Sequence, residues 1–234
     1  MTHCTTLLPP SWLDADQLHA GTVLAIDKPL HWTSFDVVKK LRSALNIKKV
    51  GHAGTLDPLA TGLLLLCTGS KTKMIHHYQG LEKVYTGEMV LGKTTPSIDL
   101  ETAFDSEVTY DHLTLADIHQ QVAPFVGTIT QVPPAYSAVK VQGKRAYEKA
   151  RQGQSPVLRP REVFVRSLEL TDIQLPSIRF KVVCGKGTYI RSLVRDFGQQ
   201  LGVGAYLKAL CRTHIGTFSL EEAYALSALT KSHP

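Results

Sequence analysis

One carboxylate stands in the most unusual stretch of the chain, residues 51–62, which reads GHAGTLDPLATG. Its three glycines and one proline exclude a regular helix and indicate tight turns. The proline biases the residue before it, Asp57, toward an extended backbone, and His52 and Thr55 lie close by in sequence. The apolar run Leu63–Cys67 is typical of a strand buried on both faces. Such a loop can hold Asp57 as a reactive group on a rigid frame, although a structural turn capped by the carboxylate is an equal alternative.

The elements that flank this loop can be predicted from periodicity and caps. Residues 22–26 are typical of a strand, which ends at the DKP sequence of residues 27–29. Thr33 and Asp36 have the spacing of a capping box. Helical spacing then predicts the core-facing residues Phe35, Val38, Leu41 and Leu45. The cations on the other side of this helix are either a solvated face or an RNA contact.

The remainder of the chain alternates between strand and helix patterns. Tyr85, Gly87 and Met89 would share one face of a strand, where a tyrosine is more often packing than function. Residues 1–20 are predicted to be irregular because of Pro9 and Pro10. The other predicted elements are a short helix from Gly69 toward Tyr78, a strand at 83–91, a helix from Thr114 to about Phe125, paired strands at 161–175 and 178–184, a helix over 190–197, a strand at 205–213 and a short helix near 223–226.

The composition is that of an ordinary globular protein, because 43% of the 234 residues are hydrophobic and 20% are charged. No apolar run approaches the roughly 20 residues that span a bilayer, and no signal peptide is visible, so a cytoplasmic location is expected. The net charge of +6 is compatible with a polyanionic partner. The four cysteines are far apart and predict free thiols rather than a metal site. A nucleotide-binding metabolic enzyme is disfavoured, since no P-loop or dinucleotide fingerprint occurs.

Two further stretches could bind RNA or an anion. Residues 131–151 interleave five cations with two tyrosines around a Gln-Gly turn, and cations hold phosphates while aromatic rings stack on unpaired bases. Residues 184–198 form a Gly-rich turn that opens a helix, whose N-terminus can receive an anion. A solvated basic helix and a cap with a core tyrosine are the structural alternatives.

Residues 51–62 resemble the catalytic loop of the TruB class of pseudouridine synthases, which isomerise uridine in the elbow of transfer RNA. The sequence KGTYIR at 186–191 matches a second motif of this class, and the resemblance covers roughly residues 20–227. It implies a catalytic domain at 21–227 with a thumb insertion at about 129–153 that clamps the T-loop, and no C-terminal domain of the PUA type. It also implies an α/β (α+β) fold with a mixed, mainly antiparallel sheet and flanking helices, and a monomer.

The resemblance assigns catalytic roles to three residues. Asp57 would be the nucleophile, attacking C6 of the base or C1′ of the ribose, or assisting elimination to a glycal; these routes stay open. Arg191 would pair with Asp57, and its planar, permanently charged guanidinium suits that purpose. Tyr85 would stack on the target base and take or relay a proton. Because the isomerisation involves neither oxidation nor hydrolysis, no metal or cofactor is expected.

Binding roles follow from the same resemblance. His52 with Thr55 would fill the place of the flipped base, and Tyr189 and Leu210 would line the uracil pocket. Asp99 would contact an active-site partner, although residues 92–101 depart from the common family pattern. The cations expected to contact RNA are Lys28, Lys48, Lys49, Lys140, Lys144, Arg145, Arg151 and Arg212.

The expected function is the isomerisation of uridine to pseudouridine at position 55 of tRNA. Two alternatives remain open: a non-catalytic protein that binds or reshapes tRNA, and a synthase that acts on another RNA with a T-loop-like fold. A pure binder would have no need of Asp57, Tyr85 and Arg191 together.

Overall fold

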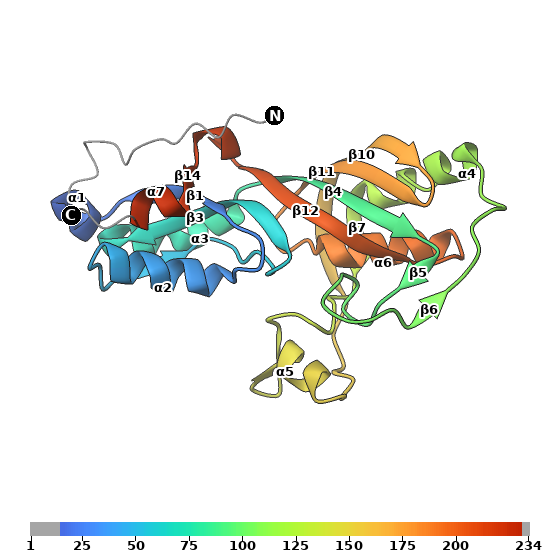
Figure 1. Cartoon of the computed structure of the whole chain (residues 1–234), viewed down its shortest axis with the longest axis horizontal. Coiled ribbons are helices and arrows are strands. Elements are labelled where there is room, and N and C mark those ends of the chain that lie inside the picture. Colours follow the sequence, from blue (N-terminus) through green and yellow to red (C-terminus); the bar gives the residue numbers. More distant parts are fainter. Residues whose placement is uncertain (1–14, 231–234) are drawn as a thin grey trace. The chain divides into compact units, whose positions relative to one another are not determined.

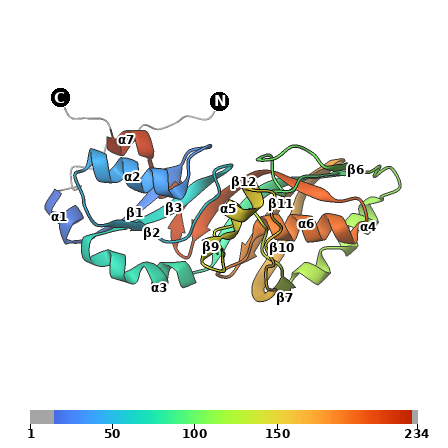
Figure 2. The ribbon, with the colours of Figure 1, turned by 90° about the horizontal axis from the view of Figure 1, so that it is seen from below.

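The strand predicted after the Gly-rich loop is present and is longer than expected. In the computed structural model, which describes residues 15–230, β3 covers Ala60–Thr68, and each residue from Leu63 to Cys67 is fully buried. Leu63 and Leu65 belong to a core cluster against which residues of α3 pack. Figure 2 shows α2 and α3 on opposite sides of β1 and β3, which explains why both faces of β3 are apolar.

The chain forms two compact units, which are described separately. Unit 1 consists of the residues up to Tyr85 together with those from Cys211 onward, and unit 2 consists of Thr86–Leu210. The chain passes from one unit to the other inside β4 (Lys83–Leu91) and returns inside β12 (Ala205–Ile215).

Unit 1 is built on strands in the order β14-β1-β3-β12, with β2 beside β3 and β13 beside β12. β1 pairs antiparallel with β3, and this register places Lys28 opposite Gly62, where the Gly-rich loop ends. β14 is the parallel partner of β1. The remaining elements are α1 (Ala15–Ala20), β1 (Val23–Lys28), α2 (Ser34–Ala44), β2 (Val50–His52), η1 (Gly69–Met74), α3 (Ile75–Gly80), β13 (Phe218–Ser219), η3 (Leu220–Glu222), β14 (Tyr224–Ala225) and α7 (Leu226–Thr230).

Unit 2 continues the strand order as β12-β4-β11-β10-β7, with antiparallel pairing of β10 with both β11 and β7. The β8–β9 hairpin and α5 extend away from these strands (Figure 1), and their residues fall within 129–153, where the thumb insertion is expected. The elements are β5 (Lys93–Thr94), β6 (Ser106–Glu107), α4 (Leu115–Gln120), η2 (Ala123–Phe125), β7 (Gly127–Gln131), β8 (Lys140–Val141), β9 (Lys144–Arg145), α5 (Ala146–Arg151), β10 (Arg161–Gln174), β11 (Ser177–Cys184) and α6 (Ile190–Gln200).

The predicted α/β class with a mixed, mainly antiparallel sheet is confirmed, as are the capping box of α2 and the paired strands β10 and β11. Within residues 15–230, no helix is long and apolar enough to cross a membrane, and no group of three or more acidic, histidine or cysteine side chains could hold a metal ion. Three described cysteines, Cys67, Cys184 and Cys211, are free, and Cys4 lies outside the described residues.

Some predicted elements are wrong in detail. Residues 15–20 form α1 rather than irregular backbone, while residues 1–14 lie outside the described residues. The helix expected to reach Phe125 ends at Gln120 and is followed by the 3₁₀ turn η2. The single short helix expected near 223–226 is instead the succession η3, β14 and α7. Phe35 is 62% exposed, because α2 presents the face of Ser34, Val37 and Leu41 to the core.

Candidate active site

The loop that carries Asp57 lies between β2 and β3 of unit 1, and the carboxylate is half-buried. The residue before it, Leu56, is fixed on both backbone groups by one hydroxyl: Leu56 N donates to Ser34 Oγ at 2.8 Å, and Ser34 Oγ lies 3.2 Å from Leu56 O. The turn closes when Ala60 N donates to Asp57 O at 3.1 Å. The loop therefore presents the Asp57 side chain from an immobilised backbone, as its sequence predicts.

Lys28 also contacts the loop of Asp57, through the carbonyl of Pro58. Its side chain is 0% exposed, and Nζ donates to Trp32 O at 2.6 Å, to Pro29 O at 2.9 Å and to Pro58 O at 3.4 Å. Burial lowers the pKa of Lys28 to about 8, although the negative charges of Asp57 and Asp27 act in the opposite direction. The prediction that Lys28 contacts RNA is wrong, because its ammonium is enclosed and its donors are used by backbone carbonyls.

Arg212 is the second buried cation of this region. It is 1% exposed; its Nε donates to Leu63 O at 2.7 Å and its Nη2 to Gly54 O at 3.2 Å. The guanidinium carbon also lies 6.0 Å from the centroid of the Tyr85 ring, which is itself only 9% exposed. This burial disfavours the prediction that Arg212 contacts RNA, because Arg212 is an internal side chain of unit 1.

His52 and Thr55 occupy the beginning of the loop. Thr55 is exposed, whereas His52 is half-buried at the end of β2. Burial, reinforced by the positive charge of Arg212, lowers the pKa of His52 below its ordinary value of 6.5. His52 is therefore an uncharged ring at neutral pH, which can stack or donate a hydrogen bond without adding a second positive charge beside Arg212.

In unit 2, Arg191 at the start of α6 is held by an ion pair and two carbonyls. Nη1 lies 3.7 Å from Asp99 Oδ2 and donates to Ser97 O at 3.0 Å, while Nη2 donates to Tyr136 O at 2.7 Å. Both side chains of the ion pair are buried, at 3% exposure for Arg191 and 6% for Asp99. The structure thus places Asp99 in an ion pair with Arg191, one of the predicted catalytic residues.

The loop that carries Asp99 is rigid although its sequence departs from the family pattern. The hydroxyls of Thr95 and Ser97 both donate to Asp99 O, at 2.6 Å and 3.1 Å. Ile98, the residue between Ser97 and Asp99, has φ 67°, a left-handed conformation that a β-branched residue adopts only under constraint. Leu207 N donates to Ile98 O at 2.8 Å, so the loop is hydrogen-bonded to β12. Single-sequence patterns gave no sign of this strained residue.

Tyr189 is fixed by two residues that sequence reasoning missed. The Gln131 side chain forms two hydrogen bonds with the backbone of Tyr189: Tyr189 N donates to Gln131 Oε1 at 2.8 Å, and Gln131 Nε2 donates to Tyr189 O at 3.0 Å. The Arg161 guanidinium lies 4.6 Å from the centroid of the Tyr189 ring and also donates to Gly187 O at 2.5 Å. Leu210, the other predicted pocket residue, is a half-buried residue of β12. Neither Gln131 nor Arg161 has a recognisable motif, so only the fold reveals them.

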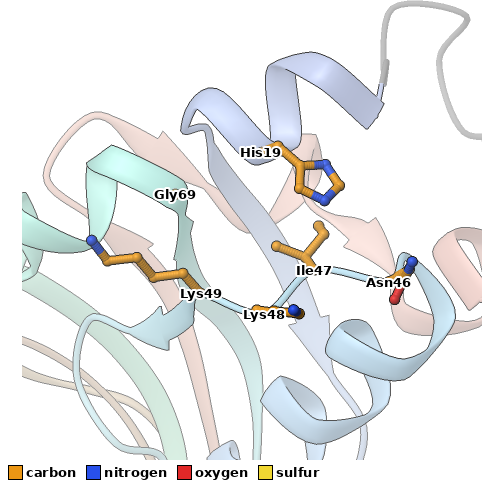
Figure 3. Close-up of a pocket in the computed structure, with 6 residues that line it drawn as sticks. All are labelled: His19, Asn46, Ile47, Lys48, Lys49 and Gly69. Atoms are coloured by element: carbon orange, nitrogen blue, oxygen red, sulfur yellow. The ribbon is translucent and has the colours of Figure 1, made fainter.

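The remaining predicted RNA-contacting cations lie on the surface. Lys140, Lys144 and Arg145 are exposed on the β8–β9 hairpin, and the Arg151 guanidinium forms an ion pair of 2.5 Å with Glu101 while its side chain stays 59% exposed. In unit 1, Lys48 and Lys49 line a pocket of about 350 Å³ (Figure 3). Its other lining residues are His19, Asn46, Ile47 and Gly69.

Comparison with known proteins gives consistent results. The sequence pattern of the family described as TruB family pseudouridylate synthase (N terminal domain) matches residues 42–190. The chain is 50% identical over 208 residues to the tRNA pseudouridine synthase B of Parabacteroides distasonis, covering 86% of this chain and 88% of the relative. It is 48% identical over 219 residues to that of Flavobacterium johnsoniae, covering 91% and 96%.

Two solved structures share the fold. One is the crystal structure of a Cbf5-Nop10-Gar1 complex, with 30% identity, a TM-score of 0.71 and coverage of 97% of this chain and 59% of that chain. The other is an H/ACA RNP bound to a substrate RNA containing 2'-deoxyuridine, with 27% identity, a TM-score of 0.68 and coverage of 97% and 58%. The chain thus spans about three-fifths of the length of these structural neighbours. With the match over residues 42–190 and the identity to full-length relatives, the chain belongs to the TruB family of pseudouridylate synthases, which are isomerases.

Proposed function

We propose that this protein converts a uridine of transfer RNA to pseudouridine, and that its target is the T-loop uridine at position 55. The names of the relatives support tRNA as the substrate. The observation that carries the proposal is the Asp57 loop: its half-buried carboxylate is accessible to a nucleotide, while Ser34, Lys28 and Arg212 hold the backbone on both sides of it. Such a preorganised group is what a reaction on one fixed atom of a base requires.

The reaction is an intramolecular exchange of bonds. The uracil leaves C1′ of the ribose through N1, turns over, and is joined again through C5. C5 loses one proton and N1 gains one, so the product is an isomer of the substrate. A base inside a folded T-loop is inaccessible, so it must be flipped into a protein pocket. We assign Asp57 as the nucleophile that holds the intermediate, and Tyr85 as the residue that stacks on the base and takes or relays the proton. No electron is gained or lost, so the reaction needs no cofactor.

Arg191 is proposed as the ion-pair partner of Asp57 during the reaction. A planar guanidinium keeps a carboxylate ionised when substrate excludes water. The rigid attachment of Arg191 to Asp99, Ser97 and Tyr136 supports this role, because a side chain used for orientation must itself be fixed. Tyr189 and Leu210 are proposed as walls of the uracil pocket, and His52 with Thr55 as the group that fills the vacated position in the RNA.

The distribution of charge supports an RNA partner. Residues 37–81 contain seven lysines and arginines and a single carboxylate, Asp57, so this segment alone carries the formal excess of +6 found for the whole chain. Lys48 and Lys49 of the pocket in Figure 3 belong to it. A segment with this excess of positive charge attracts a phosphate backbone, and its one negative group is Asp57, the proposed nucleophile. We propose that exposed cations of this segment, such as Lys48 and Lys49, bind the tRNA together with the thumb cations.

Tritium release tests the function. Purified protein is incubated with a tRNA transcript labelled with tritium at uracil C5, and the product is mapped to single nucleotides. We expect one tritium released per tRNA, from position 55, and no release with Asp57→Asn although that variant still binds. A matched transcript with cytidine at position 55 should release none.

Other results would redirect the proposal. Release from a different nucleotide would overturn the assignment of position 55. Tight binding with no release from tRNA would refute it, and would favour another RNA with a T-loop-like hairpin, which the same assay can screen. Turnover at the wild-type rate in Asp57→Asn would overturn the role of Asp57.

A further inference from the structure

Arg212 combines complete burial with a permanent positive charge. Its guanidinium stays protonated at any working pH, and a buried charge is costly unless it is well hydrogen-bonded. Its guanidinium donates hydrogen bonds to the backbone carbonyls of Gly54 and Leu63. An apolar residue would fill the same space at lower cost. Packing alone therefore does not explain the charge and the planar fork of Arg212.

The two carbonyls lie on either side of Asp57 in the chain, one in its loop and one in β3. Gly54 precedes Asp57 by three residues, and Leu63 follows it by six. A planar guanidinium can bridge two acceptors in fixed geometry, so one side chain sets the separation of the two carbonyls. The backbone of Arg212 also approaches the loop: a Cβ added to Gly62, which has φ 97°, would lie within 2.9 Å of Arg212 N. The glycine is required for this contact.

The third contact of Arg212 is with Tyr85. The guanidinium carbon lies 6.0 Å from the ring centroid, at the limit of a cation–π contact. Next to it, Thr213 Oγ1 donates to Val84 O at 3.3 Å, so the same segment of β12 also holds the strand that carries Tyr85. Arg212 is thus the side chain that contacts both the loop of Asp57 and the ring of Tyr85.

We propose that Arg212 is a positioning residue, which fixes the Asp57 loop and the Tyr85 ring relative to each other so that both act on one uridine. The proposal rests on the function proposed above for Asp57 and Tyr85. It replaces the expectation that Arg212 binds RNA, since a side chain that is 1% exposed offers no surface to a phosphate. A small displacement of a reacting group is enough to slow an enzyme about 100-fold.

The test compares Arg212→Lys with a matched control, Arg179→Lys, at an exposed position of β11. Lysine keeps the charge but lacks the planar fork, so it cannot bridge the carbonyls of Gly54 and Leu63 in the same fixed geometry. We expect kcat for tritium release to fall at least about 10-fold in Arg212→Lys, while KM for tRNA and its salt dependence stay within about twofold of wild type. The control should match the wild type in all three quantities.

Amide hydrogen exchange of the RNA-free protein provides a readout that does not depend on activity. Arg212→Lys should exchange faster than wild type across residues 53–63 and unchanged in α6 of unit 2. If Arg212→Lys does not fold, Arg212→Gln, whose planar amide can still donate to Leu63 O, is measured in the same two assays.

Each outcome is decisive. Wild-type kcat in a folded variant, or a raised KM with a weaker salt dependence and unchanged kcat, would overturn the positioning role. Unchanged exchange across residues 53–63 would also overturn it. If the wild-type protein itself released no tritium, the proposed function would fail, whereas the exchange experiment would still decide whether Arg212 fixes the loop.

Discussion

Replacing Asp99 by asparagine removes the charge of a buried ion pair and leaves the shape of the side chain intact. Asparagine can still accept the hydrogen bond that Glu101 N donates to Asp99 Oδ1 at 3.0 Å. Arg191, whose side chain is 3% exposed, loses a carboxylate at 3.7 Å but keeps the carbonyls of Ser97 and Tyr136. Breaking a buried pair by removing one partner costs about 3–5 kcal/mol. Because two carbonyls remain, we expect a loss of unfolding free energy of about 3 kcal/mol.

For a chain of this size, about 3 kcal/mol corresponds to a fall in Tm of roughly 6–12 °C. The assay is thermal and urea unfolding of the RNA-free protein followed by far-UV circular dichroism, which reports on both units. The matched control is Glu101→Gln, two residues away, which breaks an ion pair to Arg151 that is largely exposed. Exposed pairs contribute at most about 1 kcal/mol. If Asp99→Asn destabilises the protein no more than Glu101→Gln, the reasoning that burial makes the Arg191 pair important is refuted.

Three other measurements follow from the structure. Phe35→Ser should change stability by less than about 0.5 kcal/mol, whereas Val37→Ala should cost about 2 kcal/mol, because only Val37 is buried; equal losses by urea unfolding would contradict this. The pKa of His52 lies below 6.5, so the folded protein binds this proton less readily than the unfolded chain and stability is lost as the pH falls below about 6.5. His52→Gln should therefore show a smaller drop in Tm between neutral and acidic pH than the wild type. An equal drop would contradict this contribution of His52 to the pH dependence of stability. Lys144→Ala, on the exposed hairpin, should weaken tRNA binding and reduce the slope of log affinity against log salt by about 1; a salt titration with an unchanged slope would exclude a phosphate contact.

The parts of the fold that depend on local chemistry could be predicted from the sequence. The capping box of Thr33 and Asp36 is present with both hydrogen bonds, since it involves side chains three residues apart. The buried strand at Leu63–Cys67 and the pairing of β10 with β11 follow from apolar runs and alternation. The loop of Asp57 has the predicted turns because glycines and a proline restrict the backbone wherever they stand.

The errors at Phe35, Lys28 and Arg212 involve polar side chains that are satisfied inside the fold. Helical spacing predicts a core face that includes Phe35, yet the helix buries Ser34, whose hydroxyl is paired with the backbone of Leu56, 22 residues away. The resemblance implies that Lys28 and Arg212 contact RNA, yet both side chains are buried. Lys28 donates to Pro29 O and Trp32 O nearby and to Pro58 O 30 residues away. Arg212 donates to Leu63 O and Gly54 O, 149 and 158 residues away. No local pattern contains such partners, so a single sequence gives no signal of them.

The passage of the chain between the two units has a consequence for biosynthesis. Unit 2 is continuous, so it has all its residues when the ribosome has reached Leu210, whereas unit 1 still lacks the segment that begins at Cys211. Arg212 is the second residue of that segment. Asp57 is therefore translated 155 residues before Arg212, the side chain that bridges the carbonyls of Gly54 and Leu63. A nascent chain that stops before Cys211 has Asp57, the nucleophile proposed above, without the arginine proposed to position it, so we expect no isomerisation before that segment has been made.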